Sequence, residues 1–204
     1  MFKRFSISIL LSFVLLAALL VGCSPAGSRP VDIPYAKDGG YLGFSDIPDG
    51  YTAADAIADG CLVIDTTNKL NQYMATVTDT QETAGYEHWA AFTDTASRGE
   101  DAFIRVAHFI DGVGYYSDLY YLDGKYTIFD LNEYGVSEGE SFKYLRRLDG
   151  MAGPPNDRKE ACFYVLTDSL ELTYDDVSWS HLASDLSTVT DIPYVWLGFM
   201  IYFE

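Results

Sequence analysis

The spacing of apolar residues changes twice along the chain. Residues 7–21 are apolar apart from Ser8 and Ser12. Between residues 52 and 99, apolar residues recur every three to four positions, which is the spacing of an amphipathic helix. From Ala102 onward they alternate with polar residues, as in a half-buried strand. The pattern therefore predicts an apolar leader, a helical region and then a β-rich region.

Three helices are predicted between residues 52 and 99. Thr52 and Asp55 have the spacing of a capping box, and Gly60 stands where a short first helix would end. An apolar strand at 61–64 follows it. The second helix is predicted from one apolar face, formed by Leu70, Tyr73, Met74 and Val77. The third begins near Glu87, and its apolar positions are Trp89, Phe92 and Ala96.

Strands predominate after Ala102. Asp111-Gly112 and Asp123-Gly124 have the composition of tight hairpin turns. They separate predicted strands at 103–110, 115–122 and 125–131, and further strands are predicted at 142–148, 160–167, 170–174 and 194–203, with a helical turn within 175–186. The predicted fold class is α+β, with N-terminal helices packed on a twisted, meander-like antiparallel β-sheet in a single domain.

The first 23 residues have the form of a lipoprotein leader. Lys3 and Arg4 precede the apolar run, which is shorter than the roughly 20 residues of a transmembrane helix. The run ends in Leu20-Val21-Gly22-Cys23, which resembles the lipobox of bacterial lipoproteins. This predicts a signal peptide at 1–22, a lipidated Cys23, a flexible tether over 23–34 and a folded domain at 35–204. The alternative is an uncleaved hydrophobic helix.

The charge balance narrows the classes of partner. The chain has 13 Lys and Arg residues against 30 Asp and Glu, a formal net charge of −17 at pH 7. Nucleic acid is therefore not an expected partner, because clustered Lys and Arg bind the phosphate backbone. The expected partners are the membrane, through the lipid on Cys23, and either an envelope protein or a cell-wall glycan.

The other two cysteines and one acidic loop leave alternatives open. Cys61 and Cys162 lie in apolar runs of a chain expected to reach an oxidising compartment, so they form either a disulfide or two buried thiols. Asp130 and Asn132 have part of the spacing of a calcium loop, but Ser141 stands where a bidentate Glu is needed. A solvated hairpin loop is the other interpretation. We expect no cofactor.

Tyrosines are concentrated in the predicted strand at 115–122. Tyr115, Tyr116, Tyr120 and Tyr121 form a candidate interaction patch, because tyrosine is enriched at interfaces. The alternative is that they reflect the high propensity of tyrosine for strands.

The chain contains no recognisable catalytic motif. His88, His108 and His181 lie outside any metalloprotease or nucleophile signature. His108 alternates with Ile104 and Val106, so a core histidine with satisfied hydrogen bonds is expected. Asp175 and Asp176 are candidates to pair with another carboxylate for acid–base work, although two acids in a chain with 30 Asp and Glu are weak evidence.

The order of motifs between Tyr51 and Asp168 resembles a known family. A capped helix begins near Tyr51 and leads into Gly-Cys-Leu-Val at 60–63. An Ile-Arg-Val strand follows at 104–106, a Tyr-Leu-Asp-Gly turn begins at Tyr121, and an acidic loop spans Asp130 to Gly135. This order resembles a family of small Gram-positive lipoproteins whose domain has no assigned function. Cys61 departs from it, because the family usually has a polar residue there. The resemblance implies the lipoprotein address and an α+β domain, and no particular chemistry.

These observations give two competing functional hypotheses. The first is a non-enzymatic binding or interaction module at the cell surface, facing outside the cytoplasm. The second is an envelope-acting hydrolase that uses carboxylates. A third hypothesis is a purely structural or stress-response lipoprotein with no ligand.

Overall fold

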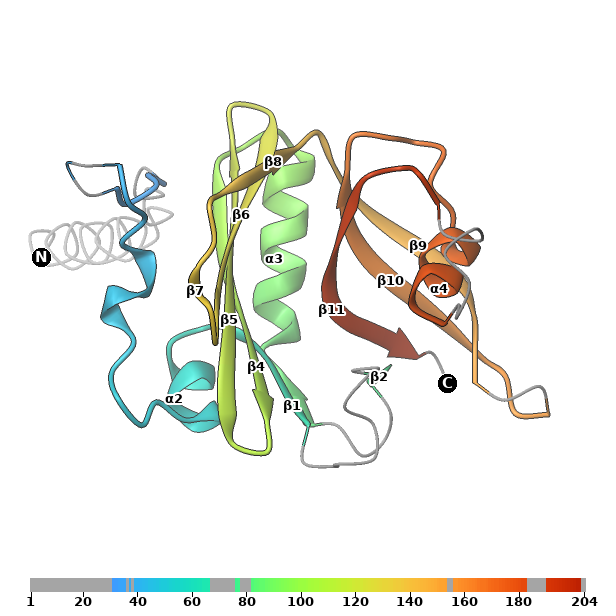
Figure 1. The fold of residues 1–204 in the computed structure, drawn as a ribbon, viewed down its shortest axis with the longest axis horizontal. Helices are drawn as coiled ribbons and strands as arrows, with labels where there is room; N and C mark the ends of the chain where they lie inside the picture. The colour runs from blue at the N-terminus through green and yellow to red at the C-terminus, as the bar shows by residue number, and fades with distance from the viewer. Residues whose placement is uncertain are drawn as a thin grey trace, which may run out of the picture. The chain divides into compact units, whose positions relative to one another are not determined.

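Two β-sheets carry most of the fold (Figure 1). They are seen in a computed structural model that describes residues 31–35, 37, 39–66, 76–77, 82–153, 156–182 and 190–202. The first sheet has the strand order β3-β1-β4-β5-β6-β7, with β8 paired to β6, and the second has the order β2-β11-β10-β9. Both belong to a compact unit that spans Asp32–Glu204.

In chain order, the elements are η1 (Gly43–Asp46), α2 (Ala53–Ala58), β1 (Leu62–Thr66), β2 (Thr76–Val77), β3 (Glu82–Ala84), α3 (Tyr86–Ser97), β4 (Ala102–Ile110), β5 (Val113–Leu122), β6 (Lys125–Asn132), β7 (Gly135–Val136), β8 (Glu140–Phe142), β9 (Tyr144–Ala152), β10 (Lys159–Thr167), α4 (Tyr174–Leu182) and β11 (Tyr194–Tyr202).

The two predicted Asp-Gly hairpins are confirmed. Asp111 and Asp123 both have φ of 51°, and the glycine after each also has a positive φ. Such turns match the right-handed twist of the strands that they join. They place Ile110 opposite Val113 and Leu122 opposite Lys125, which fixes the register of β4, β5 and β6.

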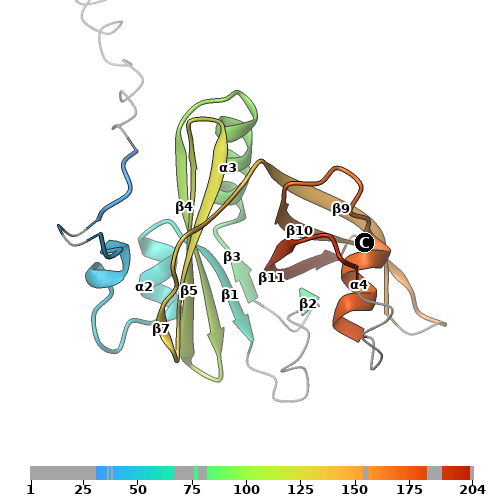
Figure 2. The same ribbon diagram turned by 45° about the horizontal axis from the view of Figure 1, so that its top comes forward.

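The main apolar core lies between the two sheets and includes the buried face of α3 (Figure 2). Trp89 and Phe92 come from α3, Leu119 from the first sheet and Leu166 from the second. The third predicted helix is therefore confirmed, and its apolar stripe is core.

A smaller core lies between α4 and the second sheet. Leu172 and Tyr174 are buried there, but residues 170–173 are not a strand, so the strand predicted at 170–174 is wrong. The Oδ2 atom of Asp176 accepts hydrogen bonds from the amide and the hydroxyl of Thr173, and this capping box starts a helix instead.

The prediction that helices come first and pack on one antiparallel sheet is wrong, although an α+β or mainly β class fits. Within the described ranges, α2 is the one α-helix before β1, and α4 lies between β10 and β11. The Thr52–Asp55 capping box of α2 is confirmed. Pairing between distant segments overrides the local pattern: β1 runs parallel to β4, and β2 pairs in parallel with β11. Val77 thus lies in a strand, while the rest of the predicted second helix, residues 67–75, lies outside the described residues.

We predict that Gly85→Ala destabilises the protein more than Gly99→Ala. Both glycines have φ near 77°, so each alanine adds roughly 1–2 kcal/mol of left-handed backbone cost. A Cβ at Gly85 would lie 2.0 Å from the carbonyl oxygen of Cys61, whereas a Cβ at Gly99 meets nothing within 4 Å. The clash adds about 1–3 kcal/mol, measurable by urea unfolding. Equal losses of unfolding free energy would contradict this packing.

Candidate functional site

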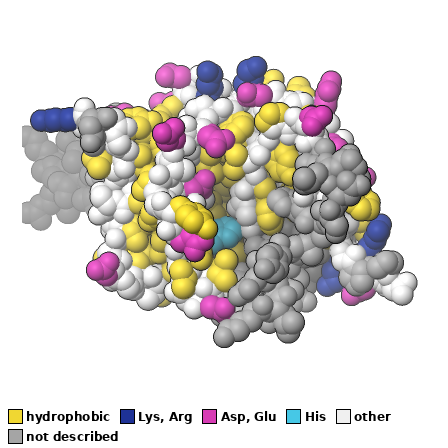
Figure 3. Space-filling model, viewed as in Figure 1, with side chains coloured by type: hydrophobic (Ala, Val, Ile, Leu, Met, Phe, Trp, Pro, Cys, Tyr) yellow, Lys and Arg dark blue, Asp and Glu magenta, His cyan; other side chains and the backbone are white. Residues whose placement is uncertain are grey.

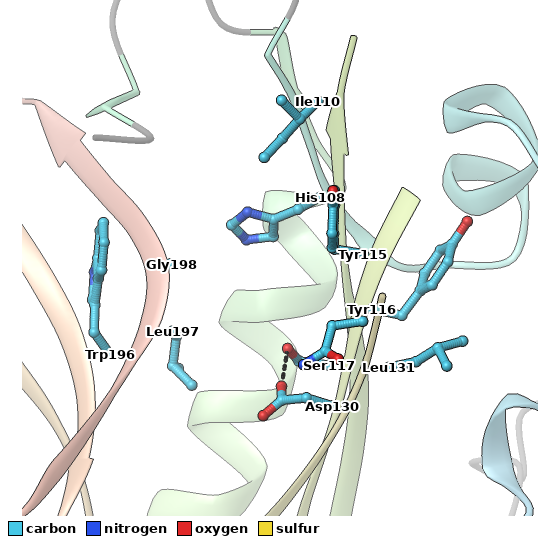
Figure 4. Close-up of a pocket in the computed structure, with 11 residues that line it drawn as sticks. His108, Ile110, Tyr115, Tyr116, Ser117, Asp130, Leu131, Trp196, Leu197 and Gly198 are labelled. Carbon is cyan, nitrogen blue, oxygen red and sulfur yellow. Dashed lines mark hydrogen bonds between the residues drawn. The ribbon is translucent and has the colours of Figure 1, made fainter. Parts of the chain in front are cut away.

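A cavity of about 280 Å³ lies between the first sheet and β11 (Figure 4). Its polar lining includes His108 from β4, Ser117 from β5 and Asp130 from β6, and its apolar lining includes Ile110 and Leu197. The space-filling view shows a hollow on this face, where a histidine is visible among apolar and acidic side chains (Figure 3). This volume is close to the lower end of the range for small-molecule sites, about 300–1,000 Å³.

The strand register places the three polar residues on one face of the first sheet. Val106 lies opposite Ser117, and Ser117 lies opposite Asp130. Because alternate residues of a strand share a face, His108 lies on the same face as Val106. Further along this face the residues are apolar and buried, including Ile104, Leu119 and Ile128. The polar group therefore begins where the apolar core between the sheets ends.

His108 is held neutral in this position. Burial lowers its pKa to about 4, against the opposite effect of a hydrogen bond to the backbone of Leu197. The Nε2 atom is buried and has no hydrogen-bond partner among the described residues. The expectation of a fully satisfied core histidine is therefore wrong within the described part of the chain. An imidazole nitrogen without a proton is a hydrogen-bond acceptor.

A bulge in β11 makes room for His108. Trp196 lies opposite Val165, but Met200 lies opposite Phe163, so the register shifts between these two pairs. Gly198 lies within the bulge with a φ of 78°, and a Cβ there would come within 2.8 Å of Cε1 of His108. A glycine is thus required both by the backbone conformation and by the approach of the imidazole.

Ser117 and Asp130 form the other polar part of the cavity. The Ser117 hydroxyl donates to Oδ1 of Asp130 at 2.6 Å (Figure 4). The Asp130 main-chain amide donates to the hydroxyl of Ser137, which holds the backbone of β6 in place. Burial raises the pKa of Asp130, against the hydrogen bond from Ser117, and the charge of Asp118 raises it further.

This arrangement offers hydrogen-bond acceptors beside apolar walls. A nucleophilic serine would donate its proton to a base such as histidine, whereas Ser117 donates to a carboxylate. Among the described residues, no group of three or more His, Cys, Asp and Glu could hold a metal ion. The geometry is thus suited to binding a molecule that donates hydrogen bonds.

The opposite face of the first sheet carries a buried ion pair. Arg105 donates through Nε to Oδ1 of Asp118 at 2.6 Å, and Asp118 is fully buried. The same guanidinium donates to the carbonyl of Gly43 at 2.6 Å and to the exposed Asp46 at 3.1 Å. The Tyr41 hydroxyl also donates to Asp118. These bonds fasten residues 41–46 across the sheet.

The candidate tyrosine patch is divided between the two faces of β5. Tyr116 and Tyr120 are buried on the face that residues 41–46 cover, and the Tyr120 hydroxyl lies 2.9 Å from that of Tyr41. Tyr115 and Tyr121 are half-buried on the face toward the second sheet. The four tyrosines therefore do not form one exposed surface.

The weak calcium candidate residues already have partners. Asp130 accepts from Ser117, and Oδ1 of Asn132 accepts from the amide of Tyr134 at 2.9 Å. Asn132 thus closes the turn between β6 and β7. The side chain of Asp130 instead faces the cavity (Figure 4).

The remaining candidate residues lie apart from the cavity. Cys61 and Cys162 are buried, and no disulfide joins them. His88 is exposed beside Glu87, and the side chain of His181 lies outside the described residues. Asp176 caps α4 through its bonds with Thr173, and Asp175 lies exposed in the first turn of the same helix. Sequence reasoning missed Ser117 and Gly198.

Comparisons of this chain with protein-family models, curated proteins and solved structures give no match. The resemblance to small Gram-positive lipoproteins therefore stays a prediction. Within the described ranges, no helix has the length and apolar character needed to cross a membrane.

We predict that His108→Gln removes part of the acid sensitivity of folding. His108 has a pKa of about 4 in the folded chain, against roughly 6.5 when unfolded, so the unfolded chain takes up the proton first. Stability that depends on neutral His108 is therefore lost as the pH falls from about 6.5 to about 4. Glutamine does not titrate, so the variant lacks this loss of stability. Asp130 is present in both proteins, so its titration does not cause a difference between them.

The measurement is urea unfolding of both proteins between about pH 7 and pH 4. Wild type should lose more unfolding free energy than the variant over this range. A difference between the two proteins that does not change with pH would contradict the burial of a neutral His108.

Proposed function

We propose that this protein is a lipid-anchored, extracytoplasmic binding protein that holds a small ligand in the cavity between its two sheets. The observation that carries the proposal is the Nε2 atom of His108, buried beside the cavity without a partner among the described residues. Leaving a buried polar atom unsatisfied costs roughly 1–3 kcal/mol. A bound molecule that donates a hydrogen bond would remove this cost.

Two observations favour a small ligand over the other functional hypotheses. Tyr116 and Tyr120 are buried, which weakens the case for an envelope protein or a cell-wall glycan docking on a tyrosine surface. Asp130 is the acidic residue among those that line the cavity, so the two carboxylates of a glycoside hydrolase are not assembled there. The binding hypothesis is therefore preferred to the envelope-acting hydrolase.

The proposed location depends on the leader and on Cys23. The apolar run, the basic residues before it and the lipobox-like ending occur together at the N-terminus. Two or more acyl chains give stable anchoring, whereas one gives marginal binding. A tether over 23–34 would then present the domain outside the cytoplasm.

We predict that Cys23→Ser moves the protein from the membrane fraction to the soluble fraction and abolishes its labelling by radioactive palmitate. Serine has no thiol to receive the diacylglyceryl group. Cys162→Ser, a change far from the leader in sequence, serves as the control and should keep the label. Palmitate labelling that persists in the Cys23 variant would contradict lipidation at this residue.

We predict that the full-length protein, extracted from cells in a mild detergent, carries a non-covalent small molecule in native mass spectrometry. Ser117→Leu should lose this adduct, because the larger side chain enters the cavity. Ser97→Leu, on the exposed end of α3, is the matched control and should retain it.

Far-ultraviolet circular dichroism and thermal melting of each variant show whether it is folded. Wild type without any adduct, or equal adduct on wild type and folded Ser117→Leu, would contradict the proposed site.

A further inference from the structure

We propose that the ligand of this cavity is a small organic cation, an ammonium group attached to an apolar body, held between His108 and Asp130. The inference rests on the proposed function and specifies the ligand class. It is carried by the juxtaposition of two hydrogen-bond acceptors, the Nε2 atom of His108 and the Asp130 carboxylate, on one face beside apolar walls.

The acceptor character of both groups selects a donor. A neutral imidazole nitrogen without its proton can only accept, and an ionised carboxylate can only accept. The Ser117 hydroxyl, which could have served a ligand as a donor, is directed to Asp130 instead. An ammonium group has three N–H donors and no acceptor, so it matches this lining.

The charge balance favours a cation over a neutral donor. Asp130 is half-buried, and burial raises its pKa. A buried carboxylate without a counter-charge is unfavourable, whereas a hydrogen bond between opposite charges is shorter and stronger than a neutral one. The Arg105 guanidinium already pairs with Asp118 on the other face of the sheet, where it also bonds Gly43 and Asp46. The net charge of −17 would also raise the local concentration of cations around the domain.

The walls define the rest of the ligand. Ile110 and Leu197 line the cavity with apolar atoms, and Gly198 presents backbone without a side chain. The volume of about 280 Å³ has room for a short alkyl or aryl group. A simple hydrated metal ion would leave these apolar walls without a contact.

The test is isothermal titration calorimetry of the full-length protein with three probes of similar size: phenethylammonium, phenethyl alcohol and phenylacetate. We expect phenethylammonium to bind at least about tenfold more tightly than the alcohol, which is the factor expected for one charge-assisted hydrogen bond. We expect no binding of phenylacetate. The variants Asp130→Asn and His108→Gln should each weaken the cation at least about tenfold, and Asp149→Asn, at an exposed carboxylate, should not.

Asn and Gln keep the approximate shape of the residues that they replace, and thermal melting shows whether each variant is folded. If phenethyl alcohol or phenylacetate binds as tightly as phenethylammonium, the proposal that the ligand is a cation is wrong, while the cavity remains a ligand site. If none of the three probes binds wild type, the proposed cationic ligand is overturned. The proposed function is then tested separately by the presence or absence of the adduct in native mass spectrometry. An unchanged affinity in both folded variants would place the cation elsewhere and overturn the site.

Discussion

The register of three strands, set by two Asp-Gly turns, is the constraint on which the rest of the structure depends. With Ile110 opposite Val113, and Leu122 opposite Lys125, every cross-strand neighbour in β4, β5 and β6 is determined. A slip of one residue would exchange the two faces of a strand. The same register places Arg105 opposite Asp118 on one face and Ser117 opposite Asp130 on the other.

The two faces use their polar residues differently. On the face covered by residues 41–46, the buried Asp118 accepts from Arg105 and Tyr41, and the guanidinium is shared with Gly43 and Asp46. Breaking a buried ion pair of this kind by removing one partner typically costs about 3–5 kcal/mol of unfolding free energy. This network therefore fixes residues 41–46 on the sheet. On the face toward the second sheet, the Nε2 atom of His108 has no partner among the described residues, and Asp130, which accepts from Ser117, faces the cavity. The contrast supports a structural role for the first set and a binding role for the second.

Much of this arrangement could be predicted from local sequence. The turn residues, the period-two strands and the Thr52 cap all act over a few residues, and each was predicted correctly. The pairing of Ser117 with Asp130 can also be predicted from the sequence, by counting five residues outward along each strand from the Leu122–Lys125 pair at the Asp123-Gly124 turn. The position of β11 did not follow, because it depends on pairing with β10 and on a bulge at Gly198. If the position of β11 is not known, the sequence predicts an ordinary core residue at His108 and gives no sign of the cavity, whose second wall is formed by β11. The strand predicted at 170–174 is wrong for a different reason, because the Thr173–Asp176 cap that starts α4 is itself a local signal.

The most direct measurement is a high-resolution crystal structure of the full-length protein isolated from its own cells without stripping or refolding. The account predicts connected density for a non-protein molecule in the cavity, with a donor atom within hydrogen-bond distance of Nε2 of His108 and of the Asp130 carboxylate. A cavity filled by the protein's own side chains, with Nε2 of His108 bonded to one of them, would contradict the central claim that this face of the sheet is built to hold a ligand.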